Sequence, residues 1–164
     1  NKGKVTHASD GSGCGVKVES GGTFNMYGGK ITGNTTNTYG GGVYVYGGNS
    51  KFNMYGGTIT DNTATKGGGG VYVSGGTFTM NGGASSVSKN TAKNGGGVSV
   101  SSGTFNMNDG KISGNTGNGV FVHRVQHADR HGEHDHKERC CQQCVSDLGR
   151  QNHHRHGRSE LRRW

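Results

Sequence analysis

The sequence predicts an all-β solenoid, a parallel β-helix of about four coils of about 27 residues with three short strands each. Three observations lead to this fold class. Short stretches that alternate apolar and polar residues recur along residues 1–122, clusters of Gly, Asn and Thr separate them, and one Asn recurs in every repeat. Period-two alternation indicates strands, and Gly and Asn are typical of turns because both accept a positive φ.

Three kinds of stretch define the repeat. Phe-x-Met returns at spacings of 28, 26 and 27 residues, beginning at Phe24, Phe52, Phe78 and Phe105. Val-x-Val begins at residues 43, 71 and 98, with further copies at 16–18 and 120–122. A single β-branched residue recurs as Ile31, Ile59, Val87 and Ile112. Coils of a parallel β-helix stack about 4.8 Å apart, so equivalent residues would lie directly over one another.

The alternation also predicts the core. Both apolar side chains of each Phe-x-Met and Val-x-Val stretch point to the same face. Stacked coils would enclose a thin, dry column, which explains how a chain with 27% hydrophobic residues folds. The predicted core is Phe24, Met26, Val43, Val45, Phe52, Met54, Val71, Val73, Phe78, Met80, Val98, Val100, Phe105 and Met107.

Two polar rows accompany the repeat. Asn34, Asn62, Asn90 and Asn115 follow the β-branched residue by three positions and are predicted to form a structural ladder of stacked amides. Ligand binding by these amides is the alternative. Thr35, Thr63, Thr91 and Thr116 come directly after them. Such a Thr row indicates a solvated β-face, and ice binding is the alternative function for it.

The composition excludes several other classes of protein. The chain has 35 Gly, no Pro and 17% charged residues. So few apolar residues exclude a thick globular core and a transmembrane helix, which needs about 20 consecutive apolar residues. Collagen is excluded too, because Pro is absent and the Gly spacing is irregular.

The motifs carry a family resemblance. Gly28-Gly29-Lys30-Ile31 and Gly56-Gly57-Thr58-Ile59, each leading to an Asn, resemble the Gly-Gly-Ala-Ile elements of chlamydial polymorphic outer membrane proteins. Over about residues 15–122 the pattern is similar to right-handed β-helix repeats of bacterial surface proteins and autotransporter passengers. Where that family has Phe-x-x-Asn, this chain has Ile-x-x-Asn. The resemblance implies a right-handed helix, a location at the cell surface, in the outer membrane or secreted, and an adhesive role.

An enzyme is the next class to weigh, because polysaccharide lyases and hydrolases also use parallel β-helices. Such chemistry needs clustered carboxylates or carboxylates with Arg or Lys. Residues 1–122 have no Arg, and their acids, Asp10, Glu19, Asp61 and Asp109, are far apart in sequence. We therefore expect no catalytic residues, no cofactor and a non-enzymatic structural or adhesive role. The alternative is a non-catalytic carbohydrate-binding segment of a larger polysaccharide-active enzyme.

Aromatic rows distinguish these two functions. Tyr27 aligns with Tyr55, and Tyr44 aligns with Tyr72. Sugar binding needs exposed Tyr or Trp side chains flanked by carboxylates and amides, whereas these Tyr have no acidic neighbours in sequence. Cross-coil stacking is therefore the expected role of the Tyr pairs.

The expected partners follow from charge and from the coil ends. The Lys residues are scattered, which favours solubility over nucleic-acid binding. A host, matrix or glycan ligand is expected, of unknown identity. The chain begins without Met and without a signal-peptide pattern, so we interpret it as a fragment of a larger array. Uncapped coil ends would then favour self-association.

The composition changes abruptly at residue 123. Residues 123–164 hold all eight Arg, eight of the nine His and three of the four Cys. Shifting Val125–Ala128 by one nucleotide permits Phe-Asn-Met, and out-of-frame Gly and Thr codons read as Arg and His. A frameshifted reading of further repeats is therefore one hypothesis for this tail, and a genuine disordered tail is another. A metal site is the third hypothesis, although no metal is expected; its candidate ligands are His134, His136, Cys140, Cys141, Cys144, His153, His154 and His156.

Overall fold

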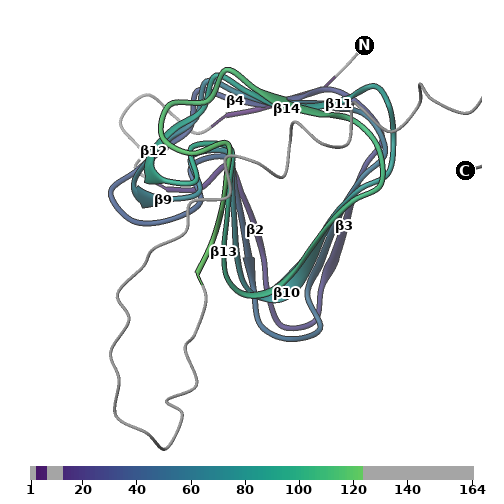
Figure 1. Ribbon diagram of the computed structural model, residues 1–164. Helices are drawn as coiled ribbons and strands as arrows, with labels where there is room; N and C mark the ends of the chain where they lie inside the picture. The colour runs from purple at the N-terminus through teal and green to yellow at the C-terminus, as the bar shows by residue number, and fades with distance from the viewer. Residues whose placement is uncertain (1–2, 7–12, 124–164) are drawn as a thin grey trace, which may run out of the picture.

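The computed structural model describes residues 3–6 and 13–123. Viewed along the stacking axis, successive coils superpose on one closed, three-cornered outline, as Figure 1 shows. Within these described residues, neighbouring coils pair through parallel strands in register: Ile31 with Ile59, for example, and Ile59 with Val87. This arrangement confirms the predicted all-β parallel β-helix of about four coils of about 27 residues.

The first face of the solenoid is the isoleucine sheet, named for the row of β-branched residues at its centre. Its strands are β1 (Lys4–Val5), β4 (Lys30–Thr32), β8 (Gly57–Thr60), β11 (Ser85–Ser88) and β14 (Lys111–Ser113), in that order. Val5 pairs with Ile31 and so adds a coil before the first predicted one. Lys4-Val5-Thr6 repeats Lys30-Ile31-Thr32, which is the sequence signal for this extra coil.

The second face is the valine–phenylalanine sheet, which contains both the Val-x-Val and the Phe-x-Met stretches. The Val-x-Val strands are β2 (Val16–Val18), β6 (Val43–Tyr46), the first part of β10 (Val71–Met80) and of β13 (Val98–Met107), and β15 (Val120–Val122). The Phe-x-Met strands are β3 (Thr23–Met26), β7 (Lys51–Met54) and the second parts of β10 and β13.

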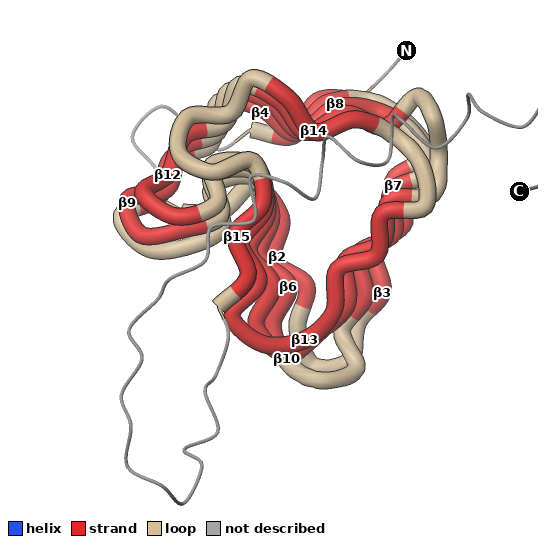
Figure 2. Tube along the Cα trace, in the orientation of Figure 1, coloured by secondary structure: helices blue, strands red, loops and turns tan. Residues whose placement is uncertain are grey.

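This sheet differs from the prediction of separate short strands. Figure 2 shows β10 and β13 as long strands, whereas earlier coils have a loop at this place. Four residues separate Val73 from Phe78, but six separate Val45 from Phe52. The shorter connection lets the ladder continue through a bulge at Ser74–Thr77, and the longer one forms a turn.

The third face is the threonine sheet, built from β5 (Thr35–Thr36), β9 (Thr63–Gly67) and β12 (Thr91–Asn94). Thr35 pairs with Thr63, Thr63 pairs with Thr91, and Thr91 forms a bridge to Thr116. The Thr row noted in the sequence therefore forms strands of its own. These strands lie on the lobe at the left of Figure 1.

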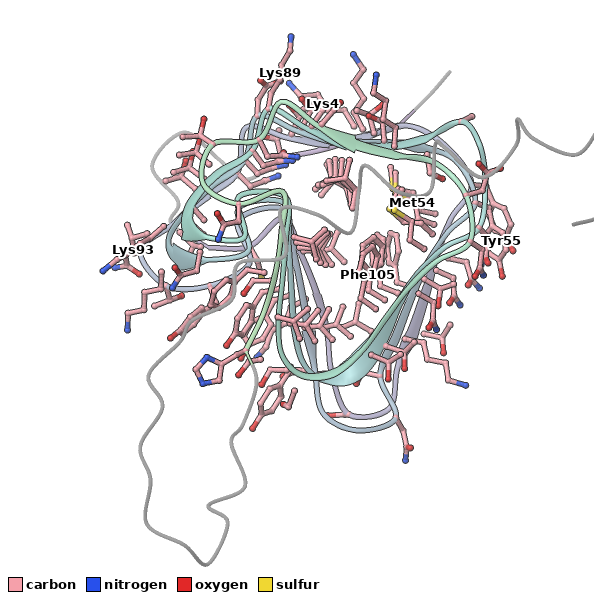
Figure 3. All side chains as sticks on the ribbon, viewed as in Figure 1. Lys4, Met54, Tyr55, Lys89, Lys93 and Phe105 are labelled. Carbon is pink, nitrogen blue, oxygen red and sulfur yellow. The ribbon has the colours of Figure 1, made fainter. Side chains whose placement is uncertain are left out.

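The interior is the apolar column that the alternation implies. Figure 3 shows Met54 and Phe105 pointing into the solenoid. Eleven of the fourteen predicted core residues are buried, and three residues near the ends of the stack are partly buried against them: Phe24, Phe105 and Met107. The Phe rings contact one another from coil to coil: Phe24 stacks on Phe52 at a centroid distance of 5.2 Å and Phe78 on Phe105 at 5.0 Å, whereas Phe52 meets Phe78 edge to face at 5.6 Å. Ile31, Ile59, Val87 and Ile112 join the same column.

The glycines before each Val-x-Val strand let neighbouring coils approach closely. A Cβ added to Gly69 would lie 2.5 Å from the carbonyl oxygen of Thr91 and 2.6 Å from that of Gly96. Both oxygens belong to the next coil's backbone, which cannot move aside like a side chain. Gly68, with φ of +64°, makes the corner itself. These runs are therefore corners of the coil.

The described part ends one residue beyond the predicted solenoid segment 1–122. The amide N of His123 donates a 2.7 Å hydrogen bond to the carbonyl oxygen of Val100, so it continues the β15 ladder. The predictions for the rest of the tail, namely frameshift, disorder and metal binding, concern residues 124–164, which lie outside the described residues.

Candidate binding surface

The most regular outer surface of the solenoid lies on the Phe-x-Met half of the valine–phenylalanine sheet. Because Phe and Met point inward there, the alternating residues point outward. The ladder continues one residue past each strand, since Tyr55 N donates to Met26 O and Asn81 N donates to Met54 O, both at 2.8 Å. We call this surface the tyrosine–asparagine strip; it consists of Thr23, Asn25, Tyr27, Lys51, Asn53, Tyr55, Thr77, Thr79, Asn81, Thr104, Asn106 and Asn108.

The first two coils contribute aromatic rings to the strip. The rings of Tyr27 and Tyr55 stack with centroids 5.0 Å apart and planes 10° apart. Tyr27 is 74% exposed and Tyr55 is 43% exposed. Figure 3 shows Tyr55 on the outer side of the solenoid. The expected cross-coil stacking is therefore present, and it leaves most of the Tyr27 ring in contact with solvent.

Amide pairs flank this stack. Asn53 Nδ2 donates a 2.9 Å hydrogen bond to Asn25 Oδ1, and both atoms lie on the exposed surface. In the later coils, Asn108 Nδ2 donates to Asn81 Oδ1 at 2.8 Å. Each hydrogen bond fixes the orientation of two side chains. Lys51 is the only charged residue of the strip.

A second aromatic group lies where the threonine sheet meets the Val-x-Val strands. Tyr39 stacks on Tyr72 at 4.3 Å, and Tyr44 meets the edges of Tyr72 at 5.4 Å and Tyr46 at 5.9 Å. Lys66 Nζ lies over the Tyr39 ring, 5.6 Å from its centroid. Tyr72 is only 8% exposed, because its neighbours cover it. Burial raises the pKa of the Tyr44 phenol, and the neighbouring phenols of Tyr72 and Tyr46 raise it further.

The structure also shows an ion pair beside this aromatic group. Lys17 pairs with Tyr44 across β2 and β6, and Glu19 follows Lys17 by two residues. The carboxylate is held by Lys17, whose Nζ lies 2.6 Å from Glu19 Oε2. This pair raises the pKa of Lys17. Sequence reasoning missed Tyr39, because the residues in register with it in the next coils, Gly67 and Asn94, are not aromatic.

The four ladder amides lie at the corner between the isoleucine and threonine sheets. Asn34, Asn62 and Asn90 are fully buried, and Asn115 is partly exposed at the last coil. Asn62 Nδ2 donates to Asn90 Oδ1 at 2.9 Å and to Ile31 O at 3.0 Å, so one amide joins three coils. Among the described residues, every buried side-chain nitrogen and oxygen has a hydrogen-bond partner. The ladder amides therefore form their hydrogen bonds between coils, as expected of a structural ladder.

The remaining candidate groups are dispersed. Glu19 pairs with Lys17 beside the aromatic group of Tyr39, Tyr44, Tyr46 and Tyr72, which we call the Tyr44 corner. Asp61 precedes the ladder residue Asn62 and accepts a 3.0 Å hydrogen bond from Thr60 Oγ1 at its Oδ2. Asp109 follows Asn108, the last residue of the tyrosine–asparagine strip. Asp10 lies outside the described residues. Within residues 3–6 and 13–123, no three His, Cys, Asp or Glu side chains gather closely enough to hold a metal ion. The same residues contain no helix of the length and apolarity needed to cross a bilayer.

Comparison with known families assigns the fold. Residues 4–152 match the right-handed β-helix region, so the chain belongs to this family. The comparison supplies the handedness that the coil stacking alone leaves open. Searches of curated proteins and of solved structures found no match.

Proposed function

We propose that the chain is a non-enzymatic structural and adhesive segment of an exported bacterial surface protein. In this role, the solenoid is a stiff rod that presents its outer faces to a host or matrix partner. The observation that carries the proposal is the tyrosine–asparagine strip, whose exposed side chains are held in rows by stacking and hydrogen bonds. The resemblance of the Gly-Gly-x-Ile elements to chlamydial polymorphic outer membrane proteins and autotransporter passengers supports a location at the cell surface or outside the cell.

An adhesion assay tests this role. Beads coated with the full chain are expected to bind cultured epithelial cells, or surfaces coated with laminin or fibronectin, more than beads coated with albumin. Heat-unfolded chain on the same beads is the matched control, since the rows exist only in the folded state. Adhesion that is no higher than that of albumin, or that survives unfolding, would contradict the proposal.

The non-enzymatic part of the proposal has its own test. Incubation of the chain with neutral and acidic polysaccharides is expected to release no reducing ends and no unsaturated products. Sustained turnover that increases with protein concentration would show an enzyme.

A second candidate function is a non-catalytic carbohydrate-binding segment of a larger polysaccharide-active enzyme. One observation favours it: Tyr27 and Tyr55 are exposed and lie beside the paired amides of Asn25 and Asn53. Aromatic faces and amides are the groups that recognise sugars, through apolar contact with ring C–H groups and hydrogen bonds to hydroxyls. A glycan array probed with the full chain tests this function, and silence across the array would count against it.

A further inference from the structure

We infer that Tyr27, Tyr55, Asn25 and Asn53 form a binding site for a neutral oligosaccharide. This inference rests on the carbohydrate-binding candidate above and names its site and its ligand class. Stacking of the two rings and the hydrogen bond between the two amides place an apolar surface and a polar surface side by side on adjacent coils.

The aromatic half of the site is Tyr27. Tyr27 is 74% exposed even though Tyr55 stacks on its ring. A flat, exposed aromatic face is suited to the apolar C–H face of a pyranose ring. The Tyr55 ring behind it holds Tyr27 in position, which reduces the entropy lost when a ligand binds.

The polar half of the site is the Asn25–Asn53 pair. Tyr27 follows Asn25 by two residues on the same face of β3, and Tyr55 follows Asn53 in the same way on β7. Each Asn amide offers two donor hydrogens and an acceptor oxygen, and the bond between them engages one donor and one acceptor. Both side chains are accessible, so the pair presents donors and acceptors to sugar hydroxyls at fixed positions.

The charge of the surface selects the ligand class. Apart from Lys51, the residues of the tyrosine–asparagine strip are uncharged, and none is acidic. A single exposed Lys is screened by salt and contributes little to binding a polyanion. The strip also lacks the carboxylates that would attract an amino sugar with a free ammonium group. Hydroxyl and acetamido groups are therefore the sugar substituents that match it.

The Tyr44 corner supplies a contrast within the same molecule. Its most exposed ring, Tyr46, is 51% exposed and lies on the Val-x-Val half of the sheet, next to the Lys17–Glu19 ion pair. Replacing Tyr46 removes an exposed Tyr of the same chemistry without touching the proposed site. This makes Tyr46→Ala the matched control.

The experiment is calorimetric titration of the full chain with neutral hexasaccharides, namely cellohexaose, xylohexaose, mannohexaose and chitohexaose, and with hexagalacturonate as the acidic probe. The wild type is expected to bind at least one neutral probe. Tyr27→Ala and Asn25→Ala should each weaken that binding, Tyr27→Ala by about tenfold, which corresponds to about 1.4 kcal/mol. Tyr27→Phe, which keeps the ring, should retain most of the affinity, and Tyr46→Ala should match the wild type. Circular dichroism confirms that each variant is folded.

Each other outcome overturns part of the inference. Neutral binding that Tyr27→Ala and Asn25→Ala leave unchanged, or that Tyr46→Ala abolishes, would overturn the site and leave the carbohydrate-binding function standing. Binding of hexagalacturonate alone would overturn the ligand class. Binding of none of the probes would overturn the inference, and an array that is silent as well would overturn the carbohydrate-binding candidate, without affecting adhesion to protein surfaces.

Discussion

Replacing Asn90 by Ala removes the central amide of the buried ladder. Asn90 Oδ1 accepts from Asn62 N at 3.0 Å and from Asn62 Nδ2 at 2.9 Å. Its Nδ2 donates to Ile59 O at 2.9 Å and to Asn115 Oδ1 at 3.1 Å. The variant loses all of these bonds at a site that water does not reach, because Asn90 is 0% exposed.

The expected loss of stability follows from these bonds. A net contribution of about 1 kcal/mol for each gives a destabilisation of about 4 kcal/mol. Stabilities of single domains are about 5–15 kcal/mol, so this single change removes a large fraction of the total. Urea unfolding of the full chain, followed by circular dichroism, measures the change in the free energy of unfolding.

Two further variants make this test specific. Asn108→Ala removes an amide whose hydrogen bond, to Asn81, is exposed, and it should change stability by no more than about 0.5 kcal/mol. Asn90→Asp keeps an acceptor for Asn62 but aims a second oxygen at the oxygens of Ile59 and Asn115. Burial among acceptors should raise the pKa of this carboxyl, so the variant regains stability as the pH falls through that value. A loss below about 1 kcal/mol for Asn90→Ala would refute the reasoning.

Three further predictions follow from the backbone and from Cys14. Lys89 has a φ of 56°, a left-handed conformation that favours glycine, at the position that Gly33 and Gly114 occupy in other coils. Lys89→Gly should therefore raise the free energy of unfolding by about 0.5–1 kcal/mol. The control Lys93→Gly, on β12, should lower it, because glycine weakens a strand. Gly69→Ala should destabilise the chain by about 1–3 kcal/mol, because the added Cβ would meet the backbone of the next coil. Gly28→Ala should be neutral, because a Cβ added at Gly28 would have no atom within 4 Å. Equal effects of the two substitutions would contradict the close approach of the coils at Gly69. Burial raises the pKa of the Cys14 thiol. Iodoacetamide at pH 8 should therefore label the Cys14 peptide more slowly in the folded chain than in urea, and equal labelling rates by mass spectrometry would refute this. The free energy of unfolding should also fall as the pH rises past the ordinary pKa of a thiol.

Much of the fold could be predicted from the sequence because the structure is a stack of near-identical coils. Phe52 and Phe78 recur at the coil spacing and pair in register in the structure, with their rings in edge-to-face contact, since a strand buried on one face must keep its register. The parallel arrangement was predicted from the recurrence of the same three stretches in every repeat of about 27 residues, which places like residues over one another when the coils stack. Val5 was missed although Lys4-Val5-Thr6 repeats a later stretch, because one β-branched residue is a weak signal by itself.

The features that the sequence did not predict depend on differences between coils, in connection length and in the exposure of single side chains. The continuous strand β10 depends on a connection two residues shorter than that of the preceding coil, and a motif search ignores such differences. Tyr39 stacks on Tyr72, but the residues that follow it in register in the next two coils are Gly67 and Asn94, so the repeat gave no signal for an aromatic residue there. The exposure of Tyr27 depends on how its ring stacks on Tyr55. Alignment predicts such a row, but not how much of each ring the solvent reaches.

Nuclear Overhauser contacts between strands β8 and β11 test the parallel stacking most directly. Parallel strands in register predict contacts that join Thr58 with Ser86, Ile59 with Val87, and Thr60 with Ser88, so that residue numbers rise in the same direction along both strands. Contacts that join Thr58 with Ser88 and Thr60 with Ser86 would show antiparallel strands and would contradict the stacked coils on which the outer rows depend.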